Sequence, residues 1–118
     1  MLKYIRLTLL SFKKVVYGDT INTKIQISDD KMNVEVSGRL DIESSYGLER
    51  ELMENISGIT ELILDFKGLE YISSSGLRVI LTIQRMMKDQ GKLIVKNVNE
   101  FVMEVLKTTN IDKLLDIQ

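Results

Sequence analysis

Three consecutive serines, Ser73, Ser74 and Ser75, precede Gly76 at the point where an apolar run ends and a helical pattern begins. Serine hydroxyls at a helix start can accept hydrogen bonds from the backbone N–H groups that the first turn leaves unpaired. One serine is enough for such a cap, so the other hydroxyls need another role. A hydroxyl here is well placed to carry a phosphate; a capped helix start with no further function is the alternative.

A phosphate on this turn would change the surface of the protein more than its fold. A phosphoserine adds about two negative charges and three acceptor oxygens, and the N–H groups and dipole at a helix N-terminus favour that charge. Asp41, Asp65 and Glu70 are expected to add negative charge nearby. A docking protein would have to desolvate the phosphate or would be repelled by it, so we expect phosphorylation to switch docking rather than folding.

The composition excludes most other catalytic chemistry. The 118 residues contain neither histidine nor cysteine, so a Ser-His-Asp triad, a Cys-His dyad and the usual zinc sites cannot form. The serine turn also lacks the glycine spacing and the lysine of a P-loop or a dinucleotide-binding loop. Asp65, at the end of an apolar run, is expected to cap a turn rather than to act as a catalytic carboxylate. We therefore expect no enzyme, no cofactor and no metal site.

Charge and hydropathy bear on partners and location. The net charge of -1 gives no indication of binding to nucleic acid. No stretch approaches the roughly 20 apolar residues of a membrane-spanning helix, so we expect no integral membrane segment. The absence of cysteine fits a reducing compartment. Together these features predict a cytoplasmic protein.

Residues 1–21 are expected to form an N-terminal extension of uncertain structure, ahead of one domain over residues 22–118. The extension mixes apolar with basic residues. A signal peptide is disfavoured, because charges interrupt the apolar stretch and no small-residue cleavage site follows. A basic amphipathic helix on a membrane or a partner is one alternative. A strand or helix packed on the domain or on a dimer mate is favoured, which leaves a homodimer open.

Hydrophobic periodicity predicts the strands of this domain. Residues 23–28 and 32–37 each alternate between apolar and polar, and a turn over residues 29–31 joins them. This pattern is typical of an antiparallel hairpin. Two short apolar runs, 62–65 and 92–96, predict two further strands, of which the first is expected to be central and covered on both faces.

Helical patterns separate and follow the later strands. The first helix is expected to be capped by Ser44 or Ser45 and to end at Gly58, and the second to run from the serine turn to Gly91. A third helix follows an Asn99 cap, and a short amphipathic helix comes last. Because helices connect the later strands, those strands must be parallel, and right-handed crossovers should place the long helices on one face. The sequence predicts an α/β fold with a mixed sheet.

The residues around the serine turn also resemble a known family. Residues 62–66 (LILDF) and 71–77 (YISSSGL) resemble the signature of the STAS domains of anti-sigma factor antagonists. Residues 34–41 (VEVSGRLD) and 105–114 (VLKTTNIDKL) support the likeness, which covers roughly residues 22–118. The resemblance implies a four-stranded mixed sheet flanked by about four helices.

The resemblance also implies a function in partner switching. In such proteins the unphosphorylated form binds an anti-sigma factor kinase and thereby frees a sigma factor. The kinase phosphorylates the serine immediately before the glycine, which is Ser75 here, and a phosphatase reverses the modification. The residues that would border the docking surface are Asp41, Ser73, Ser74, Gly76, Leu77 and Arg78.

Two features depart from the family pattern. The motif usually begins with aspartate where this chain has Ser73, which removes a charge beside the expected phosphoacceptor. The N-terminal extension is also atypical. The alternative function is a constitutive scaffold or regulatory STAS module of a transporter or signalling assembly, in which the serines only cap a helix.

Overall fold

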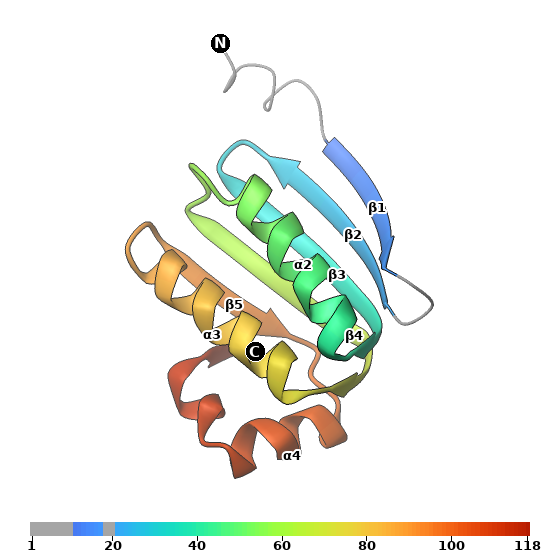
Figure 1. Ribbon diagram of the computed structural model, residues 1–118. Helices are drawn as coiled ribbons and strands as arrows, with labels where there is room; N and C mark the ends of the chain where they lie inside the picture. Colours follow the sequence, from blue (N-terminus) through green and yellow to red (C-terminus); the bar gives the residue numbers. More distant parts are fainter. Residues whose placement is uncertain (1–10, 18–20) are drawn as a thin grey trace.

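Parallel and antiparallel strands share one sheet in this protein. The computed structural model describes residues 11–17 and 21–118, and in these residues the strands lie side by side in sequence order (Figure 1). The first three strands pair antiparallel, and β3 to β6 pair parallel. The described strands are β1 Ser11–Tyr17, β2 Ile21–Ser28, β3 Lys31–Leu40, β4 Glu61–Ile72, β5 Lys92–Lys96 and β6 Asp116–Ile117.

The predicted mixed sheet is confirmed, but the expected number of four strands is wrong. One additional strand lies at each edge of the described sheet. β1 lies within the expected extension of residues 1–21, where paired lysines and paired valines hide any alternation. β6 has only two residues, too few to show a period. The remaining residues of the expected extension before β2, 1–10 and 18–20, lie outside the described residues.

Helices occupy the connections between the parallel strands. The described residues form three α-helices, α2 Ile42–Asn55, α3 Ser74–Lys88 and α4 Glu100–Thr108, and one 3₁₀ helix, η1 Ile111–Leu114. Figure 1 shows α2 and α3 side by side across one face of the sheet, as the crossover rule predicts. Within the described residues, no helix has both the length and the apolar character needed to cross a membrane.

The core lies between α2, α3 and the sheet face that they cover. Four residues in register, Ile25, Val34, Leu64 and Val95, form one buried row across β2 to β5. β4 is central, as predicted, but the prediction that both of its faces are covered is wrong. Ile63, which points to the other face, stays partly exposed. An apolar run this short does not reveal how much of each face is covered.

β4 is longer than predicted, because residues 66–72 continue the strand instead of forming a loop. β5 pairs with β4 only as far as Asp65, but β3 follows β4 to its end. Along this stretch β4 carries one extra residue between Asp65 and Gly68 and a second between Leu69 and Tyr71. Such bulges bend a strand and increase its twist.

The far end of α3 is fixed to the start of β4. Gln90 Nε2 donates hydrogen bonds to the carbonyl oxygens of Ile56 and Ile59, at 2.8 and 2.7 Å. Lys92 N–H donates to Thr60 O at 3.0 Å. A Cβ atom on Gly91 would overlap the backbone of Thr60. Gly91 is therefore required by this close approach of two backbone segments.

Replacing Gly91 with alanine should destabilise the protein. The added methyl group would force the Thr60 backbone away and weaken the Lys92–Thr60 hydrogen bond, at a cost of about 1–3 kcal/mol. Urea denaturation would measure the loss. Lys88→Ala, at an exposed position of α3, is the control and should change stability by less than about 0.5 kcal/mol. Equal stability of the two variants would contradict the prediction.

Candidate functional site

Two helices begin side by side at the same edge of the sheet. β3 ends at Leu40 and Asp41 caps α2; β4 ends at Ile72 and Ser73 caps α3. Leu40 and Ile72 are register partners, and Ser73 N–H donates a hydrogen bond to Leu40 O at 2.8 Å. Figure 1 shows α2 and α3 starting together at this edge. We refer to residues 41–44 and 73–78 as the helix-start edge.

Asp41 and Ser44 cap α2 reciprocally. The carboxylate of Asp41 accepts a hydrogen bond from Ser44 N–H at 2.9 Å, and Asp41 N–H donates to Ser44 Oγ at 2.9 Å. The predicted cap at Ser44 or Ser45 is therefore wrong by three or four positions. The spacing of Asp41 and Ser44 resembles a capping box and was the available signal. Ser45 Oγ donates to Asp41 O from within the helix.

The carboxyl group of Asp41 is held in its ionised form. Hydrogen bonds from the backbone N–H and then the hydroxyl of Ser44 lower the pKa of Asp41 below its ordinary value of 3.8. The Glu43 backbone N–H and the positive charge of Arg39 act in the same direction, and burial opposes them. The helix-start edge thus carries a fixed negative charge at neutral pH.

The three serines of α3 have different environments. Ser73 Oγ accepts a hydrogen bond from Gly76 N–H at 3.2 Å, which confirms that one serine caps the helix. Ser74 is exposed and Ser75 is partly buried, and both lie in the first helical turn. Neither hydroxyl forms a side-chain hydrogen bond with another described residue. Two hydroxyls therefore stay available after capping, as the sequence suggested.

Gly76 lets the first turn of α3 rest directly on the strand ends. A Cβ atom at Gly76 would lie 2.8 Å from Ile72 Cγ1 and 2.9 Å from Leu40 Cδ2. Leu77 packs into the core, whereas Arg78 is exposed. The structure therefore brings all the predicted partner-binding residues to one edge, but Gly76 and Leu77 act there by packing rather than by presenting a side chain.

The structure also reveals surface residues that the sequence pattern did not single out. Ile42 and Tyr46, on the first two turns of α2, are 64% and 59% exposed. Their i, i+4 spacing was the available signal. On β3 and β4, the Arg39 guanidinium lies 4.2 Å from the ring centroid of Tyr71, and that ring stacks on Phe101 of α4 at 6.3 Å. These contacts join α4 to the ends of β3 and β4.

Asp65 forms structural hydrogen bonds, but at a bulge of β4 rather than at the predicted turn. Its Oδ1 atom accepts hydrogen bonds from Lys67 N–H at 3.0 Å and from Asn97 Nδ2 at 2.9 Å. Lys67 lies in the first bulge of β4, and Asn97 directly follows the end of β5. The carboxylate thus holds the bulge of β4 and links it to the residue that follows β5.

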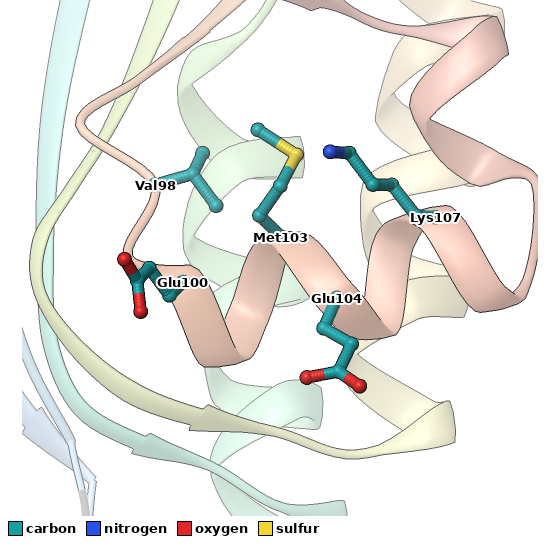
Figure 2. A pocket seen from close by; sticks show the side chains of 5 residues that line it. All are labelled: Val98, Glu100, Met103, Glu104 and Lys107. Atoms are coloured by element: carbon teal, nitrogen blue, oxygen red, sulfur yellow. The ribbon is translucent and has the colours of Figure 1, made fainter.

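A surface hollow beside α4 is a weaker candidate site. It is lined by Val98, Glu100, Met103, Glu104 and Lys107. Figure 2 shows the carboxylates of Glu100 and Glu104 pointing away from the Met103 sulfur and the Lys107 amine. Because these polar groups do not converge on a common point, they do not form a catalytic constellation.

Comparisons with known proteins relate this chain to one family. A family model described as the STAS domain matches residues 22–118. The anti-sigma-B factor antagonist of Bacillus subtilis is 26% identical over 98 residues, which are 82% of this chain and 90% of that protein. An anti-sigma factor antagonist from Mycobacterium paratuberculosis has a structure with a TM-score of 0.76 at 20% identity, covering 87% of this chain and 89% of that one.

A third relative has been solved in two states. The anti-sigma factor antagonist SpoIIAA in its unphosphorylated form matches with a TM-score of 0.69 at 17% identity, over 92% of this chain and 88% of that one. The phosphorylated form of SpoIIAA, a Bacillus cell fate determinant, matches with a TM-score of 0.64 at 16% identity, over 92% of this chain and 91% of that one. At these identities the structures show a shared fold.

Removing the Asp41 carboxylate should destabilise the protein at neutral pH. Asp41→Ala leaves Ser44 N–H without its acceptor, and loss of an N-cap costs about 0.5–2 kcal/mol. Urea denaturation at neutral pH would measure the loss. Asp41→Asn keeps an acceptor at the cap and is the matched control, with a smaller expected loss. Two variants of equal stability would contradict the role of the cap.

The difference in free energy of unfolding between wild type and Asp41→Asn should also depend on pH. A carboxyl group whose pKa is lower in the folded than in the unfolded protein stabilises the fold at any pH above its unfolded-state pKa. This contribution disappears as the pH falls through the folded-state pKa. The stability difference should therefore be constant above about pH 5 and shrink below 3.8, because the pKa of Asp41 lies below that value. A difference that grows on acidification would be inconsistent with the lowered pKa.

Proposed function

Because the chain belongs to the STAS domain family, we propose that it is an anti-sigma factor antagonist that works as a phosphorylation-controlled partner switch. The observation that carries the proposal is the uncommitted hydroxyl of Ser75 at the helix-start edge, directly before the buried Gly76. The relative from Bacillus subtilis, matched over most of its length, is named an anti-sigma-B factor antagonist. SpoIIAA, which shares the fold, has been described in a phosphorylated form.

The proposed phosphoacceptor is Ser75. The Ser73 hydroxyl already accepts the Gly76 N–H hydrogen bond, so Ser74 and Ser75 are the serines of this turn with hydroxyls to modify. The family resemblance assigns the phosphate to the serine before the glycine. The first turn of α3 offers backbone N–H groups and the positive end of the helix dipole to a phosphate. The helix should therefore persist after modification.

Phosphorylation would act on the docking surface. The surface residues of the helix-start edge include Asp41, Ser74, Ser75 and Arg78, with exposed Ile42 next to the Asp41 cap. A phosphate would add about two negative charges to a surface on which Asp41 is already ionised. A partner that buries this edge would then have to desolvate a dianion, which is costly unless the phosphate is paired.

The serine that replaces the usual aspartate of the family motif is compatible with this function. Ser73 performs the cap through its hydroxyl, so the helix start is retained with one negative charge fewer. The kinase that recognises this chain would then read the turn mainly by its shape and by the Ser75 hydroxyl itself.

We propose two partners and no catalytic role for the chain itself. The unphosphorylated form would bind an anti-sigma factor with serine kinase activity, and a phosphoserine phosphatase would reverse the modification. The protein would be a substrate rather than an enzyme. It would work in the cytoplasm, because the ATP that the kinase needs and the RNA polymerase that the sigma factor binds are both there.

The phosphoacceptor can be tested directly. Incubation with the cognate kinase and ATP should add one phosphate to the wild-type chain, read as a mass increase of the intact protein. Ser75→Ala should abolish the increase, and Ser74→Ala, which removes the neighbouring exposed hydroxyl, should keep it. Loss of the phosphate in Ser74→Ala alone, or no phosphate with an active kinase, would contradict the assignment of Ser75.

A charged side chain at the same position should weaken docking without unfolding the protein. We expect Ser75→Glu to raise the Kd for the anti-sigma factor at least about tenfold, since it places a carboxylate in the contact. Circular dichroism and Tm should stay close to those of wild type, because an acidic residue is favoured in the first helical turn. Ser75→Gln, similar in size but neutral, is the control. Equal affinities of Ser75→Glu and Ser75→Gln for the anti-sigma factor would contradict a switch based on charge.

A further inference from the structure

Arg78 is an exposed cation one helical turn after Ser75. Ion pairs join Glu61 to Lys31 and to Lys92 at the other end of the strands, and no ion pair between described residues involves Arg78. No side-chain hydrogen bond between described residues holds its guanidinium either. The first turn of α3 therefore presents an unengaged arginine next to the proposed phosphoacceptor.

The helix geometry directs this arginine toward Ser75. Residues three apart on a helix are neighbours on its surface. The side chains of a helix lean toward its N-terminus, so a long side chain covers the turn that precedes it. Arg78 is thus placed to reach over the turn that contains Ser75. Arg85 is exposed on the same helix, but it lies ten residues after Ser75, about 15 Å along the axis.

We propose that Arg78 is the internal counter-ion of phosphoserine 75. The guanidinium would donate hydrogen bonds to the phosphate oxygens, a pairing for which its planar fork is suited. The positive charge would favour the dianionic phosphate and lower its second pKa, which is ordinarily near 6. The switch would then carry its full charge throughout the neutral pH range. This inference rests on the proposed phosphorylation of Ser75.

Other charged residues lie at the same end of the neighbouring elements. They are Arg39 at the end of β3, Asp41 and Glu43 at the start of α2, and Glu70 near the end of β4. Asp41, whose pKa lies below 3.8, stays ionised while a phosphate titrates. These groups are the same in wild type and in variants of Arg78, so comparing these proteins isolates the effect of that arginine.

The test uses the full chain with phosphoserine incorporated at position 75 during synthesis, so that no kinase is needed. A ³¹P NMR titration from about pH 4.5 to 8.5 reports the second pKa of the phosphate. We expect Arg78→Gln to raise this pKa by about half a pH unit. Arg78→Lys should restore most of the shift, and Arg85→Gln, which removes an equal charge about 15 Å away, should leave the pKa unchanged.

Salt separates a charge effect from a structural one. At about 1 M NaCl the Debye length falls to roughly 3 Å, so the difference between wild type and Arg78→Gln should shrink markedly. Equal pKa values for wild type and Arg78→Gln at low salt, or an equal shift in Arg85→Gln, would overturn the counter-ion role. The kinase assay is independent of this titration. Failure of the kinase to modify Ser75 would count against the proposed function, whereas equal pKa values would count against the pairing alone.

Discussion

The parallel pairing of β3 and β4 to their last residues is the constraint on which the functional edge depends. Both strands end at one register pair, Leu40 and Ile72, and the Ser73–Leu40 hydrogen bond continues the pairing by one more step. The very next residue of each strand is a helix cap, Asp41 in one case and Ser73 in the other. Register alone thus brings a fixed carboxylate and a serine-rich helix start together, without a long loop.

The sequence predicted those parts of the fold that repeat a period over several residues. Alternation identified β2 and β3, and helical spacing with a serine or asparagine cap located α3 and α4. It did not reveal β6, which has two residues, or the continuation of β4 through Lys67, Gly68 and Glu70. Those polar residues resemble a loop, because bulges and exposure break the alternation of a strand. Only pairing with β3 shows that they belong to the sheet.

The candidate site was predictable from residue types, but its geometry was not. The serine turn identified the hydroxyls, and the family resemblance selected Ser75. The structure adds which hydroxyl is occupied by capping, that Asp41 rather than Ser44 caps α2, and that Leu77 faces the core. The exposed pair Ile42 and Tyr46 follows from the position at which α2 begins. That start depends on a reciprocal cap that propensity alone does not reveal.

The two additional residues in β4 also bend the strand end from which α3 starts. From Asp65 to Ile72, β4 advances seven residues, whereas β3 advances only five, from Glu35 to Leu40. Bulges of this kind bend a strand and increase its local twist. Because each extra residue has no partner on β3, deleting one would remove a bulge and keep Leu40 opposite Ile72. The expected consequence is a change in the direction of the strand end, and hence of the start of α3, with the register pair retained.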